Sequence, residues 1–212
     1  MRYCVRAFEN RAVSKETLKE ILDYARFAAC SKNMQPWKVY AVSGEPLKNL
    51  AADMVTALKS GEELTPSRPD SDKPPEEYWD RARTCGFSLF QLKGIARDDK
   101  EKRLAHYAEN YSFFQAPVEL FFGMDKSLPE RQLIDMGIFL ERVMNKSSEL
   151  GLGSCPQASV ADFPNVLKKH LKHPDDIEIL FGLSLGYEDK NALVNTFRTE
   201  KLSVDEFTTW IN

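Results

Sequence analysis

Cys30-Ser31-Lys32-Asn33-Met34-Gln35-Pro36-Trp37 is the stretch around which the chain is organised. It lies between a run with helical spacing and a run of strand residues, so we expect a helix-to-strand loop. Pro36 fixes its own φ and favours an extended Gln35, which gives the loop a defined path. The side chains of Ser31, Asn33 and Gln35 offer hydrogen-bonding groups, which favours a binding loop for a polar, planar ligand. An ordinary polar turn anchored by Trp37 is the alternative that this stretch leaves open.

The composition is that of a single globular domain spanning residues 1–212. Hydrophobic residues make up 42% of the chain and charged residues 29%, with a net charge of -3. These values give no sign of the basic patch that nucleic-acid or membrane-surface partners require. No apolar run reaches the roughly 20 residues of a membrane span, and the N-terminus lacks the apolar core of a signal peptide. We therefore expect a cytoplasmic protein.

Cysteine usage points the same way. The four cysteines are widely scattered and form no metal-type pair, so we expect no metal site and four reduced thiols. Their positions are Cys4, Cys30, Cys85 and Cys155.

Apolar periodicity predicts alternating helices and strands. Ser14 is a suitable N-cap for the first helix, and Gly151 is a suitable residue to follow the end of the fourth. The last strand is almost continuously apolar, which indicates a central strand covered on both faces. Helices are expected over 14–29, 46–58, 76–113, 129–150 and about 160–171, and strands over 37–42, 117–123 and 177–186.

Two segments do not fit this simple alternation. Residues 60–75 are polar and proline-rich, so we expect a surface excursion there. The helical region 76–113 is rich in aromatic residues, which either belong to the core or line an apolar substrate pocket.

The stretch 151–159 is rich in small residues, so its backbone can approach a ligand closely. We expect it to be a loop that leads directly into the helix at about 160–171, although a plain helix–helix connector is the alternative. After Tyr187 a polar tail carries Phe197, Phe207 and Trp210. Because few core positions remain for such residues, a partner subunit is a plausible place to bury them.

Five segments together resemble the FMN-dependent nitroreductase family. In the family's own order they are Arg2–Phe8, Ala28–Trp37, Gly151–Ser159, Leu185–Tyr187 and Asn195–Glu200. The resemblance runs from Arg2 to about Trp210. Tyr3 stands where the family has a second basic residue, and Cys4 and Cys30 stand where it has serine. A thiol is a weaker hydrogen-bond donor than a hydroxyl, so FMN contacts there would be weaker or rest more on backbone N–H groups.

This resemblance implies an α+β fold, a nitroreductase-like sandwich with a mainly antiparallel central sheet flanked by helices. It also implies an intertwined homodimer with one FMN per subunit at the interface. Residues 188–212 would form a dimer-embracing tail that extends over the partner. Residues 60–113 would form a lid-like insertion that covers the flavin and sets the choice of acceptor.

The family's FMN contacts carry over to positions of this chain. Arg2 and Arg198 would hold the FMN phosphate, because forked guanidinium donors suit phosphate oxygens. Tyr3 and Cys4 would contact the phosphate and the ribityl chain. Arg6 would lie near flavin N1 and stabilise the negative charge of the reduced ring.

Two further segments would hold the flavin ring. Cys30, Ser31 and Asn33 match the loop on one side of the ring and its ribityl chain. The segment over the ring, whose backbone amides approach N5, consists of Pro156, Gln157, Ala158 and Ser159.

The resemblance implies an NAD(P)H-dependent FMN oxidoreductase with a ping-pong cycle. NADH or NADPH would reduce the flavin, and a nitroaromatic, quinone or similar small planar acceptor would reoxidise it. The hard chemistry belongs to the cofactor, so no catalytic side chain is expected. Two alternatives remain: divergent flavin chemistry such as dehalogenation, oxidation or flavin consumption, and flavin binding without turnover.

Overall fold

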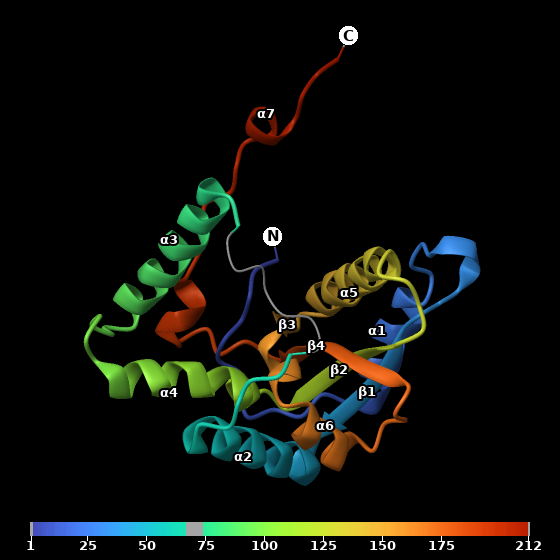
Figure 1. The fold of residues 1–212 in the computed structure, drawn as a ribbon, viewed down its shortest axis with the longest axis horizontal. Coiled ribbons are helices and arrows are strands. Elements are labelled where there is room, and N and C mark those ends of the chain that lie inside the picture. The colour runs from blue at the N-terminus through green and yellow to red at the C-terminus, as the bar shows by residue number, and fades with distance from the viewer. Residues whose placement is uncertain (1, 67–73, 212) are drawn as a thin grey trace.

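The computed structural model describes residues 2–66 and 74–211, which are built on a four-stranded sheet (Figure 1). The strands pair antiparallel in the order β1-β2-β4-β3. This sheet, flanked by helices, confirms the predicted α+β class. The strands are β1 (Lys38–Ser43), β2 (Val118–Asp125), β3 (Gly153–Gln157) and β4 (Ile177–Gly186).

Helices cover both faces of the sheet (Figure 1). The helices α1 and α5 pack on one face, and α2, α6 and the end of α4 pack on the other. Figure 1 shows α3 and the C-terminal segment extending away from these layers. Within the described residues no helix is long and apolar enough to cross a membrane. The helices are α1 (Lys15–Ala25), α2 (Gly44–Ser60), α3 (Glu76–Leu92), α4 (Lys100–Tyr111), α5 (Gln132–Glu149), α6 (Pro164–Leu171) and α7 (Val204–Phe207).

The central strands β2 and β4 divide the core into two clusters. Alternate residues of β2, such as Leu120 and Phe122, join the cluster beneath α1 and α5. Phe121 points to the opposite face and joins the cluster beneath α2 and α6. Side chains alternate along a strand, so a strand covered on both faces is apolar nearly throughout. The expectation of a covered central strand is confirmed, since β4 lies between β2 and β3.

The first helix is shorter than the sequence predicts. Ser14 caps it as expected, and its side chain accepts a hydrogen bond from the Thr17 N–H. The helix ends at Ala25 rather than continuing toward residue 29, because a tight turn closes with the Ala28 N–H bonded to the Ala25 carbonyl. Ala28 is still buried, so an apolar spacing that reads as helix is satisfied by a turn.

The 151–159 stretch is not a loop that leads directly into a helix. Residues Gly153–Gln157 form edge strand β3, and Ser159–Asp162 form a short 3-10 turn before α6 begins at Pro164. The strand lacks the β-branched and aromatic residues that mark strands, and its pairing with β4 overrides that weak propensity. Proline at the first position of α6 disfavours a helical Phe163, which separates the two elements.

The Cys30–Trp37 loop is a helix-to-strand connection, as expected, with a 3-10 turn over Ser31–Asn33. Trp37 stacks on Phe139 of α5 with ring centroids 4.5 Å apart and anchors the loop. The prediction of an extended Gln35 is wrong, because its φ is +47°. Pro36 disfavours the right-handed helical region for the preceding residue, and this compact turn uses the left-handed region instead.

The aromatic residues of 76–113 divide into two groups. Tyr111 and Phe113 are buried, together with the adjoining Phe114, whereas Phe87 of α3 is 58% exposed. The core interpretation therefore holds only for the end of this region. The other exposed aromatics are Tyr78, Trp79 and Tyr107. Of the expected excursion at 60–75, Ser60 ends α2, residues 61–65 are exposed, and 67–73 lie outside the described residues.

The inward face of α5 also differs from expectation. Val143 and Met144 are buried as predicted, but Ile134 is 67% exposed. Gln132 and Asp135 are buried instead. Both bond to the 30–34 loop, since Gln132 Nε2 donates to Met34 Sδ and Asp135 accepts from the Ser31 N–H. These two bonds account for polar side chains on the inner face.

Replacing Gly186 with alanine tests how tightly the end of β4 is packed. An added Cβ would lie 2.5 Å from Cδ of Pro117, a rigid ring, so we expect a loss of about 1–3 kcal/mol in the free energy of unfolding. Gly86→Ala inside α3 is the matched control, because no neighbour among the described residues lies within 4 Å of its added Cβ. That variant should be neutral or more stable by up to about 1 kcal/mol. Urea unfolding curves measure both, and equal stability of the two variants would contradict this packing.

Candidate functional site

The N-terminal arm and the turn at 193–196 are joined by the side chain of Asn195. Its Oδ1 accepts a hydrogen bond from the Arg6 N–H at 2.8 Å. Its Nδ2 donates to the Ala7 and Asp189 carbonyls, each at 2.8 Å. Asn195 is buried, so these bonds are shielded from water and hold the arm firmly against the C-terminal turn.

Three arginines of the predicted site gather around this junction. Arg198 lies over the Tyr3 ring, with Cζ 3.3 Å from the ring centroid, and donates to the Asn195 carbonyl. Cζ of Arg6 lies 5.9 Å from the ring centroid of Phe197. The two chain ends that the sequence predicts to meet therefore do meet within one subunit.

Arg2 has an unsatisfied donor. Its Nη1 is buried and has no hydrogen-bond partner among the described residues, and its Nε lies 4.0 Å from Glu141. A buried guanidinium N–H without an acceptor is costly, and a phosphate oxygen is the acceptor that suits it best. The residues of the arm therefore fit the phosphate of FMN.

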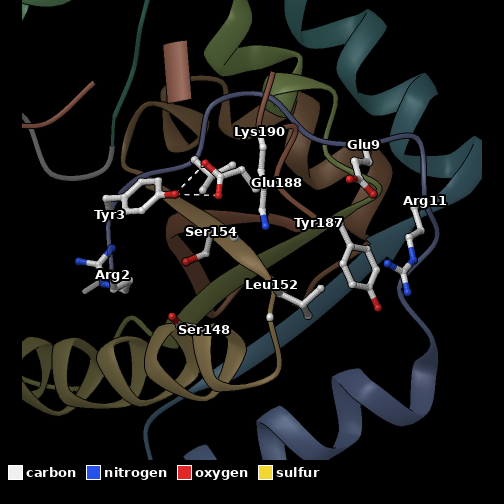
Figure 2. A pocket seen from close by; sticks show the side chains of 13 residues that line it. Arg2, Tyr3, Glu9, Arg11, Ser148, Leu152, Ser154, Tyr187, Glu188 and Lys190 are labelled. Carbon is white, nitrogen blue, oxygen red and sulfur yellow. Dashed lines mark hydrogen bonds between the residues drawn. The ribbon is translucent and has the colours of Figure 1, made fainter. Parts of the chain in front are cut away.

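A cleft of about 340 Å³ opens beside the arm (Figure 2). In Figure 2 the Tyr3 hydroxyl points at Glu188, to which it donates at 2.7 and 2.8 Å. This bond raises the pKa of Tyr3, so the phenol stays neutral. Of the predicted FMN contacts only Arg2 and Tyr3 line the cleft, together with Ser154, Lys190 and other residues. The cleft and the predicted site therefore overlap only at the arm.

Cys4 runs alongside β3 and lies in an electropositive place. It forms an isolated parallel bridge with Ser154, and the next N–H, that of Val5, donates to the Ser154 carbonyl at 3.0 Å. A hydrogen bond with Cys155 and the charges of Arg6 and Arg2 lower the pKa of the Cys4 thiol below its ordinary range. A site that stabilises a thiolate also favours other anions.

The predicted flavin-facing segment is the end of β3 and the residues after it. Gln157 is buried, and its Nε2 donates to the Asn110 carbonyl at 2.7 Å. Ala158 is exposed, and Pro156 and Ser159 are partly exposed. Within this segment the Gln157 side chain is therefore fixed in the interior, and its neighbours along the chain are accessible.

The structure does not bring the Cys30, Ser31 and Asn33 loop to this place. The Ser31 N–H bonds to Asp135 in the first turn of α5, whereas β3 follows the other end of that helix. Eighteen helical residues span about 27 Å. Within one subunit the two predicted halves of the flavin site are separate, and Figure 1 shows them near opposite ends of α5.

Sequence reasoning missed several residues of the junction. Asn195 lies inside a matched segment, but its role as a clasp depends on a partner 189 positions away. Glu188 and Ser154 likewise gain their partners only through the fold. The three histidines lie elsewhere: His106 contacts Lys93, His170 contacts Asp53, and His173 contacts the Pro174 carbonyl.

Asn195→Ala should detach the arm. The change leaves the partly buried Arg6 N–H without its acceptor, so we expect a loss of about 1–3 kcal/mol in unfolding free energy. Hydrogen exchange of the Arg6 N–H should accelerate with it. Asn191→Ala is the control, because only the backbone N–H of Asn191 is bonded. Unchanged exchange in the arm of the Asn195 variant would contradict the clasp.

Alkylation by iodoacetamide reports the electrostatics at Cys4. Because its pKa is lowered, the thiolate form should persist below the ordinary thiol pKa of about 8.5. The alkylation rate of Cys4, followed by mass spectrometry against pH, should therefore reach half its maximum well below that value. Cys4→Ser should abolish this component. A Cys4 rate that titrates near the ordinary thiol pKa of about 8.5 would show that neither the Cys155 hydrogen bond nor the arginines lower the pKa of the thiol.

Comparison with known proteins gives this geometry a context. The model of the nitroreductase family matches residues 1–187. A 4-nitrobenzoate reductase of Pseudomonas putida is 34% identical over 207 residues, which cover 98% of this chain and 91% of the relative. A nitrobenzene nitroreductase of Ectopseudomonas oleovorans is also 34% identical, over 98% of this chain and 92% of its own length.

A solved structure agrees with the fold. The FMN-dependent nitroreductase NfnB from Mycobacterium smegmatis, in complex with NADPH, superposes with a TM-score of 0.95 at 29% identity. The match covers 100% of this chain and 95% of that one. The family model, the relatives and the shared fold lead to one conclusion: the chain belongs to the nitroreductase family.

Proposed function

We propose that this protein is an FMN-dependent oxidoreductase that transfers reducing equivalents from NADH or NADPH to a nitroaromatic, quinone or similar planar acceptor by a ping-pong mechanism. The names of the relatives support nitroaromatic acceptors, and the NADPH complex of NfnB supports the electron donor. We place the protein in the cytoplasm.

One observation carries this proposal: the arm and the Asn195 turn bring Arg2, Arg6 and Arg198 to one place. The charges of Arg2 and Arg6 both act on the Cys4 thiol, and Arg2 keeps a buried donor without an acceptor among the described residues. An anion with several oxygens balances this positive charge and supplies the missing acceptor, and the FMN phosphate is such an anion.

Each part of the site has a separate role in this proposal. Arg2 and Arg198 bind the phosphate, and Tyr3 and Cys4 line the approach to it. Arg6 holds a positive charge where the reduced ring becomes negative. The Pro156–Ser159 segment orients the ring through its backbone amides. When bound, FMN supplies hydride acceptance and electron donation, so the protein needs no general base of its own.

We further propose a homodimer, because one subunit leaves the site incomplete. The 30–33 loop would reach the flavin of the partner subunit rather than that of its own. The outer face of α5 carries the exposed residues Ile134 and Ile138, and in the described part of the chain no neighbour lies within 4 Å of a Cβ added at Gly137. A surface of this kind lets a second helix approach closely.

The C-terminal tail supports the same assembly. Phe207 and Trp210 are 65% and 68% exposed, and Ile211 is 91% exposed. Large apolar side chains at a chain end are expected to be covered, and we propose that the partner covers them. The exposed aromatic residues of α3, with those of α4, would then form a lid over a planar acceptor.

The proposed activity is tested on the purified protein loaded with FMN. Under anaerobic conditions NADH or NADPH should bleach the yellow flavin, and nitrobenzoate or menadione should restore the colour. Double-reciprocal plots of the steady-state rate should be parallel, as a ping-pong mechanism requires. A flavin that binds but is never bleached by either nucleotide would contradict the proposal.

Arg198→Ala should weaken FMN binding by about tenfold or more, since it removes a charged phosphate donor. The salt dependence of the dissociation constant should also become shallower than in the wild type. Arg26→Ala is the control, because Arg26 pairs with Asp23 on the surface of α1. Fluorescence titration at several salt concentrations measures both, and an Arg198 variant that matches the control would rule out the phosphate role.

The double variant Ile134→Glu/Ile138→Glu should be monomeric, since it places charges in the proposed interface. If the 30–33 loop acts on the partner's flavin, FMN affinity should fall when the dimer is lost. Sedimentation velocity and FMN titration test the two effects. Lys19→Glu is the control for a change of surface charge, because Lys19 is an exposed residue of α1. A double variant that remains dimeric would exclude this face as the interface.

A further inference from the structure

A buried polar cluster lies within the sheet, beneath the end of β3. Glu119 of β2 and Ser184 of β4 are paired in register and are both fully buried. Gln157 of β3 is buried beside them, opposite Gly182. These polar side chains lie on the sheet face that otherwise packs apolar residues beneath α2 and α6.

The hydroxyl of Ser184 is surrounded by acceptors. Its Oγ lies 2.5 Å from Gln157 Oε1, 2.8 Å from Glu119 Oε2 and 3.1 Å from the Phe113 carbonyl. The Gln157 amide cannot be turned around, because its Nε2 already donates to the Asn110 carbonyl. One hydroxyl has one proton, so it cannot donate to all three oxygens.

A proton on Glu119 resolves this excess of acceptors. The Glu119 O–H then donates to Ser184 Oγ, and Ser184 donates onward to Gln157. The other carboxyl oxygen, Oε1, has no hydrogen-bond partner among the described residues, which is tolerable for a neutral acid and very costly for a buried anion. Burial raises the pKa of Glu119 well above its ordinary range and outweighs the opposite effect of its hydrogen bonds with Ser184 and the Leu183 backbone, in agreement with this assignment.

The Glu119 carboxyl group occupies space that a side chain at position 182 would fill. A Cβ added at Gly182 would collide with Glu119 Oε1 and would lie 2.9 Å from Val160. The absence of a side chain at Gly182 therefore leaves the space that the acid fills.

The cluster also connects two regions that the proposed function uses. Gln157 belongs to the segment proposed to lie over the flavin, and Asn110 lies in the last turn of α4, part of the proposed lid. Phe113, Phe114 and Gln115 have φ values of +54°, +51° and +59°. Such a run of left-handed residues persists only where its surroundings hold it, and Ser184 lies at the Phe113 carbonyl.

We propose that Glu119 is held as a neutral acid and acts, through Ser184, as a positioning residue that fixes Gln157 and thereby the flavin-facing segment and the base of the lid. The neutral acid depends only on this chain, whereas the positioning role rests on the proposed FMN function.

The state of the acid is measured without FMN. Infrared spectra at pH 7 should show the carbonyl stretch of a protonated carboxylic acid, and Glu119→Gln should remove it. An ionised carboxylate lacks this band. A wild-type spectrum without a band that this substitution removes would overturn the proposal.

Stability against pH gives a second readout independent of FMN. A carboxyl group whose pKa is raised by folding stabilises fully below its unfolded pKa of about 4.3, and the stabilisation is lost as the pH rises toward its folded pKa. As the pH rises above about 4.3, the folding equilibrium constant of the wild type should therefore fall relative to that of Glu119→Gln. The fall should be at most about tenfold per pH unit. The ionisable group that interacts with Glu119 is the buried Cys155 thiol, so both variants are compared in the Cys155→Ser background as well. Parallel stability curves for acid and amide would contradict a neutral Glu119.

The positioning role is tested by FMN affinity. Ser184→Ala and Glu119→Leu break the chain of bonds, so each should weaken FMN binding by about tenfold. Glu119→Gln restores a donor to Ser184 and should bind within about twofold of the wild type. The control is Ser147→Ala, a buried serine whose hydroxyl bonds only within α5.

The outcomes separate the two proposals. If Ser184→Ala binds FMN as tightly as the wild type, the positioning role is wrong although the flavin function stands. If the wild type itself fails to bind FMN, the proposed function and the positioning role both fail, and the infrared band still decides whether Glu119 is neutral.

Discussion

The side chain of Asn195 joins the two ends of the described chain, and the candidate site depends on that junction. Its three hydrogen bonds replace the strand pairing that the N-terminal arm mostly lacks. Because an amide can accept and donate at once, one residue satisfies groups on both sides of the junction. The arginines of the arm and of the turn are long and flexible, and only a fixed backbone can hold them together.

Polar side chains inside the sheet, like those at the Asn195 junction, need hydrogen-bond partners within the protein. The central strands of the sheet are covered on both faces, so any polar side chain inside must find its partners within the protein. Ser184 and Gln157 find theirs in one another and in the backbone at Asn110. A cluster of this kind costs little only when every proton is placed, which is why a neutral Glu119 fits better than a charged one. The base under β3 is therefore held by a buried polar cluster, whereas the arm beside it is held by the Asn195 side chain.

Sequence reasoning succeeded where a local signal was strong. The alternation and apolar runs of β2 and β4, the Ser14 cap and the position of Gly151 after α5 were all predicted and confirmed. It failed where tertiary contacts decide, as in β3, whose small residues become a strand only by pairing with β4. The inner face of α5 was misassigned because the buried Asp135 and Gln132 serve the 30–34 loop. In the site, the matched motifs identified Arg2, Arg6 and Arg198. The role of Asn195 in joining the arm to the turn became visible only in the structure.

The central claim is that the arm and the turn form a phosphate site. Titration of flavin-free protein with FMN and with riboflavin, followed by flavin fluorescence, tests it most directly, because the two ligands differ only in the phosphate. Several charged hydrogen bonds should make FMN bind roughly 100-fold more tightly than riboflavin at low salt. Equal affinity for both ligands would show that the three arginines do not hold a phosphate.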